Sequence, residues 1–254
     1  MESGRPPALE VEGLGLRIGG VTIVEDVSLQ VRRGEFLVII GPNGAGKTTL
    51  FNLISGFTRP TAGRITFGAH DVTHAAPYER ARLGLGRTFQ TSTVFAGLST
   101  FENVRLAASA ALGTSTRMWD RADGEAAPLA RARAALEEVG LGARAQTIAA
   151  QLSHGEKRKL DLAILLCSEP SVVLLDEPTA GMAVEEVGDM VDLIRRIHRE
   201  QAKTVMMVEH RMDLVLSLAD RMAVMHHGRL LALDTPERII ANETVQSAYL
   251  GDPL

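Results

Sequence analysis

The stretch Gly41-Pro42-Asn43-Gly44-Ala45-Gly46-Lys47-Thr48 decides the fold of this chain. It fits the pattern G-x-x-x-x-G-K-[ST], whose glycines allow successive backbone N–H groups to curl around phosphate oxygens. The compact apolar run Phe36–Ile40 precedes it, and the apolar residues of 50–54 follow at helical spacing. A glycine turn before a helix is the plainer interpretation, but a strand, a glycine loop and a helix in this order predict a phosphate site.

The residues of this loop have distinct expected roles. The backbone of the loop would line the phosphates of a nucleotide, and it comprises Gly41, Pro42, Asn43, Gly44, Ala45 and Gly46. Lys47 is expected to reach the β- and γ-phosphates, and the Thr48 hydroxyl is expected to bind Mg²⁺. Thr49 is a further candidate phosphate contact.

Two adjacent acids end a second apolar run, Val172-Val173-Leu174-Leu175-Asp176-Glu177. Asp176 is placed to hold Mg²⁺, usually through water. Glu177 would polarise the attacking water as a general base. Strands often exit into acidic turns, so this pair is informative because it accompanies the glycine loop.

Size and composition restrict the class of protein. The chain has 254 residues and a net charge of −4, which suits one large or two small domains with a packed core. Because there is no global basic field, nucleic acid is not an expected partner. Cys167 is the only cysteine, so it forms no internal disulfide and is expected to fill the core. No apolar run approaches the roughly 20 residues needed to span a bilayer, so a membrane role would require docking on other chains.

The remaining pattern is that of an α/β domain with a helical insertion. Alternating apolar residues predict antiparallel strands within 9–31, and further strands are expected at 63–67, 171–176, 204–208, 221–225 and 229–233. Helices are expected at 78–83, 129–139, 184–200, 213–219 and, as one final helix, from Thr235. The run from Ser99 to Glu102 has the spacing of a capping box and should open another helix. Between 101 and 167 there is no strand signal.

Three further motifs make the chain resemble the nucleotide-binding domains of ABC proteins over nearly its whole length. Leu152-Ser153-His154-Gly155-Glu156 resembles their signature, commonly L-S-G-G-Q, and stands shortly before the Asp-Glu strand. Gln90 matches their loop glutamine, and His210 matches their switch histidine. Plainer alternatives exist, since Ser153 and Glu156 also fit a capping box and His210 could be a strand-end residue.

The resemblance implies Mg²⁺-dependent ATP hydrolysis at sites that two chains share. The signature residues Ser153, His154, Gly155 and Glu156 would complete the site of a second ABC ATPase subunit, which is either a copy of this chain or a sister chain. Gln90 would bind Mg²⁺ and sense the γ-phosphate. His210 would contact the γ-phosphate and hold the attacking water with Glu177.

The resemblance also implies an architecture and a location. It predicts one nucleotide-binding domain over 8–254 and a flexible tail at 1–7. A P-loop NTPase core with an antiparallel β-subdomain would occupy 8–90 and 153–254, and an inserted helical subdomain would occupy about 91–152. Transmembrane permease subunits would dock near 91–104, and an external binding protein would act only indirectly. The chain would then be peripheral, at the cytoplasmic face of the inner or plasma membrane.

The segment after Glu177 narrows the resemblance. Ala180-Gly181-Met182 stands where many ABC proteins have Ala-Leu-Asp, and this variant resembles importers for branched-chain amino acids or amides such as urea. Two alternatives stay open: lipid or lipopolysaccharide export or extraction, and a non-transport ATPase acting on nucleic acid or ribosomes. The latter usually carries a coiled-coil insert or tandem ATPase domains, which this sequence lacks. The residues identify neither the substrate nor the direction of transport, nor do they distinguish a homodimer from a heterodimer.

Several positions depart from the common ABC pattern. Ile18 stands where an aromatic usually stacks on adenine; because stacking on a base is worth ~1–3 kcal/mol in nucleic-acid proteins, weaker nucleotide binding is expected. Ala183 replaces an aspartate that often links the two ATP sites, which puts their coupling in doubt. Glu156 replaces glutamine and adds negative charge near a partner's nucleotide. The pair His226-His227 is expected to belong to a turn, because adjacent strand residues point to opposite faces.

Overall fold

The computed structural model describes residues 6–89, 94–113 and 123–250. Within it the chain forms two compact units. The first comprises Met1–Leu85, Ser171–Glu177 and Arg195–Leu254, and the second comprises Gly86–Pro170 and Pro178–Ile194. The predicted tail lies mostly outside the described residues.

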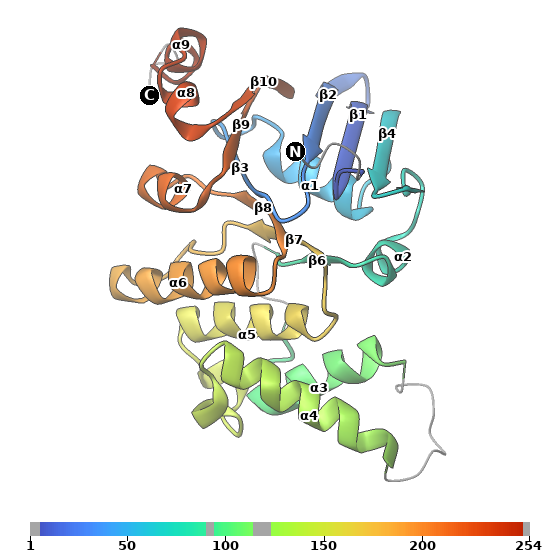
Figure 1. Cartoon of the computed structure of the whole chain (residues 1–254), viewed down its shortest axis with the longest axis vertical. Helices are drawn as coiled ribbons and strands as arrows, with labels where there is room; N and C mark the ends of the chain where they lie inside the picture. Colours follow the sequence, from blue (N-terminus) through green and yellow to red (C-terminus); the bar gives the residue numbers. More distant parts are fainter. Residues whose placement is uncertain (1–5, 90–93, 114–122, 251–254) are drawn as a thin grey trace. The chain divides into compact units, whose positions relative to one another are not determined.

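An antiparallel sheet opens the first unit. Its strands are β1 (Leu9–Ile18), β2 (Val21–Val31), β4 (Ala62–Phe67) and β5 (His70–Asp71), in the spatial order β2-β1-β4-β5. Figure 1 shows β2, β1 and β4 in this order. Leu9 in β1 lies opposite Val31 in β2 and Phe67 in β4. All three side chains are buried, so the apolar positions of neighbouring strands gather on one face and form part of the core.

A six-stranded sheet with a parallel centre carries the loops of interest, in the order β10-β9-β3-β8-β7-β6. Its strands are β3 (Phe36–Ile40), β6 (Leu85–Arg87), β7 (Val172–Asp176), β8 (Thr204–Val208), β9 (Arg221–His226) and β10 (Arg229–Asp234). Every residue of β3, β7 and β8 is buried, as is typical of parallel strands covered on both faces. Because these strands are parallel neighbours, the segments that follow them meet at one edge.

Among the described residues, the helices that lie wholly in the first unit are α1 (Lys47–Ser55), α2 (Pro77–Arg82), α7 (Met212–Leu218), α8 (Pro236–Ile240) and α9 (Glu243–Leu250). The prediction of one final helix was wrong, because α8 and α9 are separate. Asn242 lies between them, and its Oδ1 accepts hydrogen bonds from the backbone N–H groups of Thr244 (2.9 Å) and Val245 (3.2 Å). Such a side chain caps the start of a new helix.

Arg80 in α2 is a buried cation held by backbone carbonyls. Arg80 is only 1% exposed. Nη1 donates to the carbonyls of Leu53 (2.7 Å) and Ile54 (2.6 Å) at the end of α1. Nη2 donates to Thr73 O (3.1 Å) and Nε to Ala75 O (3.0 Å). Burial lowers the pKa of Arg80 to about 10, so it stays charged at neutral pH, where it complements the negative end of the α1 dipole.

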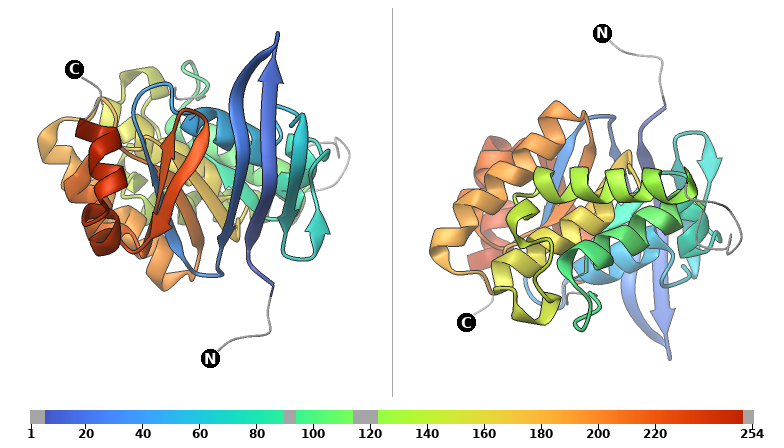
Figure 2. Two further views of the ribbon diagram at one scale, coloured as in Figure 1. Left: turned by 90° about the horizontal axis from the view of Figure 1, so that it is seen from above. Right: turned by 90° about the horizontal axis from the view of Figure 1, so that it is seen from below.

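The second unit is helical. It contains α3 (Thr100–Ala111), α4 (Asp123–Glu138), α5 (His154–Leu166) and the first turns of α6 (Val184–Glu200). In the right panel of Figure 2, α3, α4 and α5 run side by side. The predicted subdomain of 91–152 groups α5 with the core, whereas its contacts place it among these helices. Among the described residues, no helix combines the length and apolar character needed to cross a membrane.

Two local predictions for this unit have different outcomes. The hydroxyl of Ser99 caps α3 by accepting from Glu102 N at 3.1 Å. The carboxylate of Glu102 does not complete the capping box, because it pairs with Arg105 at 2.8 Å. Cys167 is buried, and this burial raises the pKa of its thiol to about 11. The prediction of a core cysteine rather than a reactive thiol is therefore confirmed.

Candidate functional site

The glycine loop between β3 and α1 adopts a conformation that only glycine allows at its first position. Gly41 has a φ of 153°, and a Cβ there would lie 2.2 Å from the carbonyl oxygen of Met225 in β9. Gly46 has a φ of 94° and is the N-cap of α1. The first-turn N–H groups of this helix therefore follow directly from the loop, as an anion site requires.

Lys47 is held across this loop. Its residue is 6% exposed, and its Nζ donates to the carbonyls of Gly41 (2.6 Å) and Pro42 (2.9 Å). Burial lowers the pKa of Lys47, and the carboxylates of Glu177 and Asp176 raise it. The predicted phosphate lysine therefore lies within electrostatic range of Asp176, which ends β7, and of Glu177, which follows it.

The predicted base and switch histidine are in direct contact. Glu177 has a φ of 48°, and its N–H donates to Val208 O at 3.0 Å. Its Oε1 lies 2.9 Å from Nε2 of His210, and both side chains are partly exposed. Because an ionised carboxylate can only accept, Nε2 donates in this bond. The parallel edge thus joins two residues that are 33 positions apart.

Glu209 is a residue of this site that sequence reasoning missed. Its residue is buried, and its Oε2 accepts from the backbone N–H of His210 at 3.0 Å. This hydrogen bond fixes the backbone direction at His210, just after the end of β8. The signal was available, because Glu209 stands between a buried strand and His210.

The other residues predicted to contact the nucleotide or Mg²⁺ have fewer contacts described in the structure. Thr48 and Thr49 lie in the first turn of α1, and Thr48 is exposed. Ile18 ends β1, where it pairs with Val21 across the hairpin and is 59% exposed. Gln90 lies outside the described residues.

The predicted signature begins α5 in the second unit. Ser153 Oγ accepts from Glu156 N at 3.1 Å, and Ser153 N donates to Glu156 Oε2 at 2.9 Å. The capping box is therefore confirmed. Arg144 Nε also donates to Glu156 Oε1 at 3.0 Å, so an ion pair offsets the charge that Glu156 adds.

Comparisons with known proteins decide the family. The family described as ABC transporter matches residues 24–180. The chain belongs to the ABC transporter family. It is 38% identical to the high-affinity branched-chain amino acid transport ATP-binding protein LivG of Salmonella typhimurium, over 97% of this chain and 98% of LivG. The protein of the same description from Pseudomonas aeruginosa, BraF, gives the same three values.

Solved ABC structures agree with the fold. A nucleotide-free ATP-binding cassette from an ABC transporter matches with a TM-score of 0.83 at 26% identity, covering 97% of this chain and 100% of the other. The ADP conformation of the ABC cassette MJ1267 matches with a TM-score of 0.83 at 27% identity, covering 97% and 99%. The predicted ABC-type α/β fold is confirmed, and the protein is an ATP-hydrolysing ABC subunit.

Two residues that depart from the common ABC pattern, His154 and Gly181, lie next to one another. His154 of the signature reaches the segment after the acids, where its Nε2 donates to Ala180 O at 3.0 Å. Gly181 follows with a φ of 74°, and a Cβ there would lie 2.8 Å from His154 Nε2. The histidine therefore occupies space that a larger residue at position 181 would need. Both residues were visible in the sequence, but their proximity was not predicted.

We expect His154 and Gly181 to be energetically coupled. In the wild-type background, Gly181→Ala both strains φ and displaces the imidazole from Ala180 O; in His154→Ala, only the strain remains. The strain cancels in a double-mutant cycle, leaving a coupling free energy of about 1 kcal/mol. Urea unfolding of the four proteins measures it. Additive effects within about 0.3 kcal/mol would show that the ring and the glycine are independent.

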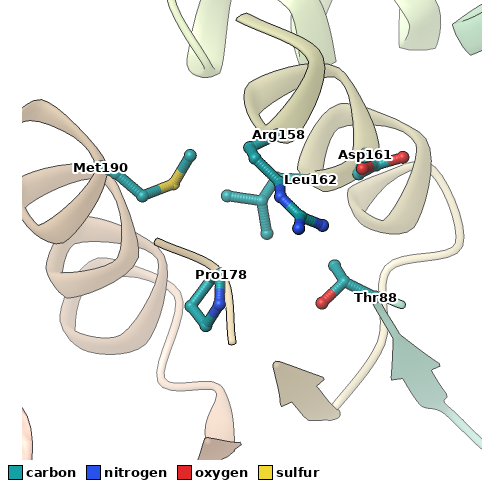
Figure 3. Close-up of a pocket in the computed structure, with 6 residues that line it drawn as sticks. All are labelled: Thr88, Arg158, Asp161, Leu162, Pro178 and Met190. Atoms are coloured by element: carbon teal, nitrogen blue, oxygen red, sulfur yellow. The ribbon is translucent and has the colours of Figure 1, made fainter. Parts of the chain in front are cut away.

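Within the second unit, α5 also contacts the segments that adjoin two predicted site residues. Arg158 is buried, and its Nη1 donates to Phe89 O, next to Gln90, at 2.9 Å. Figure 3 shows the Arg158 side chain pointing between Thr88 and Pro178, the residue after Glu177. The surrounding cavity of about 10 Å³ has room for about one water. Its lining residues are Thr88, Arg158, Asp161, Leu162, Pro178 and Met190.

Proposed function

We propose that this chain is the ATPase subunit of an importer for branched-chain amino acids or related amides. The observation that carries the proposal is the 38% identity to LivG and BraF over 97% of the chain, because both are branched-chain amino acid transport proteins by name. The variant Ala180-Gly181-Met182 supports the same assignment.

ATP would bind at the glycine loop. The N–H groups of the loop and of the first turn of α1 would surround the phosphates. Lys47 would exchange the carbonyls of Gly41 and Pro42, which its Nζ now contacts, for β- and γ-phosphate oxygens. No covalent intermediate is needed, since phosphoryl transfer depends on positioning and charge stabilisation.

The donor set fits Mg²⁺. Thr48 is an exposed residue in the first turn of α1, and the buried Asp176 carboxylate ends β7. Mg²⁺ prefers such oxygen ligands and is usually bound by one or two carboxylates together with substrate phosphates. Gln90 would be the third protein ligand. When bound, the ion neutralises charge on the β- and γ-phosphate oxygens.

Glu177 and His210 would act on the attacking water. The two side chains are hydrogen-bonded to each other at 2.9 Å. A water that entered between them would be within hydrogen-bonding reach of both. Glu177 would take a proton from that water as the water oxygen attacks the γ-phosphorus, and the bond from this phosphorus to the oxygen of the leaving ADP would break. His210 would hold the water and donate to the γ-phosphate. Glu209 would serve as a positioning residue through the His210 backbone.

Other protein subunits would complete the transporter. Ser153, His154, Gly155 and Glu156 would meet the nucleotide held by a second ATPase subunit. Permease subunits would dock near 91–104, where the exposed apolar side chains of Phe95 and Leu98 support a protein contact. The binding protein would contact the permease rather than this chain. The subunit would then work at the cytoplasmic face of the inner or plasma membrane, with no nucleic-acid partner.

Reconstitution with the permease subunits of the same transporter tests this proposal. In proteoliposomes that contain ATP, we expect a leucine-loaded binding protein to stimulate both leucine uptake and ATP turnover, and Glu177→Gln to abolish both. A panel of valine, isoleucine, urea and acetamide would separate amino-acid from amide transport. Stimulation by lipid or lipopolysaccharide, or by nucleic acid or ribosomes, with no response to any of these solutes would overturn the proposal in favour of the corresponding alternative.

Ile18→Tyr is expected to tighten ATP binding. Ile18 is exposed at the end of β1, so a larger side chain there meets no packing barrier. A tyrosine ring would stack on adenine, and stacking of ~1–3 kcal/mol corresponds to a decrease in Kd of about 5- to 150-fold. Calorimetric titration of ATP measures the change, with Ile18→Leu as the control for side-chain size. Unchanged or weaker affinity in Ile18→Tyr would show that adenine does not lie at this position.

A further inference from the structure

The carboxylate of Glu186 lies over the start of the signature helix α5. Its Oε1 accepts from the hydroxyl of Ser153 at 3.0 Å. A Cβ built on Gly155 would lie 2.7 to 2.8 Å from the three carboxyl atoms of Glu186. The carboxylate therefore rests against the Cα of Gly155, where only a glycine lets it approach the backbone.

This placement is that of an anion at a helix N-terminus. The first-turn N–H groups of an α-helix have no partner within the helix, and its dipole favours negative charge there. Glu156 of the same turn already has two partners, since its Oε2 accepts from Ser153 N and its Oε1 pairs with Arg144. Glu186 is thus a second carboxylate at the start of α5. It belongs to α6 and lies 33 positions after Ser153 in the sequence.

We propose that Glu186 is an internal competitor at the signature. Its carboxylate holds the anion position at Ser153 and Gly155 until the γ-phosphate of a second subunit's ATP displaces it. The inference rests on the proposed function, because it requires the signature to meet a partner's nucleotide. Two anions repel each other at such distances, so the Glu186 side chain leaves when the phosphate arrives, and the Ser153 hydroxyl changes its acceptor.

A purely structural tether predicts the opposite effect. If Glu186 only joins α6 to α5, its neutralisation weakens the second unit and impairs association. If it competes with phosphate, Glu186→Gln promotes association, since glutamine keeps the size but loses the charge. Glu185→Gln is the matched control: Glu185 is the adjacent acid in the first turn of α6, so its loss changes the charge of the same helix end equally.

Sedimentation of ATP-bound protein tests the competition in a Glu177→Gln background, in which slow turnover is expected to leave ATP intact. With Mg²⁺ and ATP, we expect Glu186→Gln to lower the dimer dissociation constant about tenfold, which corresponds to 1.4 kcal/mol. Glu185→Gln is expected to change it less than about twofold, as for a screened surface charge. Equal effects of the two substitutions, or weaker association with Glu186→Gln, would overturn the inference.

Hydrogen exchange gives a readout that does not need the dimer. Inorganic tripolyphosphate is expected to slow exchange at 153–157 in monomeric Glu186→Gln and to have little effect in wild type or Glu185→Gln. Equal slowing in the three proteins, or none, would refute the competitor role. Protection confined to Glu186→Gln, with no ATP-driven association of any of the proteins at any concentration, would support the competitor role and show that the second ATPase subunit is not a copy of this chain.

Discussion

Glu177→Gln reduces ATP turnover by an expected 10²- to 10⁴-fold, about the contribution of a general base. Glutamine keeps the shape of the side chain and its reach toward His210 Nε2, at 2.9 Å in the wild type, but it takes no proton at neutral pH. The glycine loop and Lys47 are untouched, so we expect the Kd for ATP to change less than about threefold. The variant therefore separates binding from hydrolysis.

Phosphate release at saturating ATP measures the first effect, and equilibrium titration measures the second. Wild-type turnover should also rise more steeply than protein concentration if two copies of this chain share each site, as the proposed role of the signature would allow. Glu237→Gln, a substitution of an exposed acid in α8, provides a control for net charge. If Glu177→Gln keeps more than about a tenth of wild-type turnover, another group takes the proton. Negligible turnover by a monomeric wild type would assign the second half-site to a different chain.

Arg80→Leu is expected to lower the free energy of unfolding by about 3 kcal/mol. Four carbonyl oxygens lose their bond from Arg80, although Leu53 O keeps a bond from Gly56 N at 3.2 Å. Each buried group that is left unsatisfied costs about 1–3 kcal/mol. The relief from no longer burying a cation offsets part of this loss. α1 also loses the positive charge at its C-terminal end, worth roughly 0.3–1 kcal/mol.

Urea unfolding monitored by circular dichroism measures this change. Arg82→Leu is the matched control, because Arg82 is in the same helix, is exposed, and contacts only the face of Tyr78 at 5.5 Å among the contacts described. We expect it to cost less than about 1 kcal/mol. Arg80→Lys should fall between wild type and Arg80→Leu, since three ammonium donors do not match a planar fork. A loss for Arg80→Leu no larger than for Arg82→Leu would contradict this account.

The sequence was sufficient for features determined by local patterns. The apolar runs of β3, β7 and β8 predicted a buried parallel centre, because fully buried strands need no alternation. The pairing of Glu177 with His210 was implied by the resemblance to ABC domains, and the neighbouring parallel strands β7 and β8 bring the two residues to one edge. The spacing of Ser153 and Glu156 predicted the hydrogen bonds between them, since a capping box lies within one helical turn.

Features that depend on distant residues were not predicted. Arg80 contacts Leu53, 27 positions away, and Glu186 contacts Ser153, 33 positions away. No periodicity or spacing rule connects such pairs, because the fold brings them together only after the elements pack. His154 and Gly181 show the same limit: each was visible as a departure from the ABC pattern, but only their proximity explains why they occur together.

The bonds from Lys47 to the loop carbonyls also bear on product release. When ADP and phosphate leave, an ammonium group that had contacted only phosphate would remain buried without acceptors, and that cost would slow departure. In this protein the carbonyls of Gly41 and Pro42 accept the same protons at 2.6 and 2.9 Å. We expect the lysine to return to them as the products leave, so that nucleotide exchange does not require the loop to unfold.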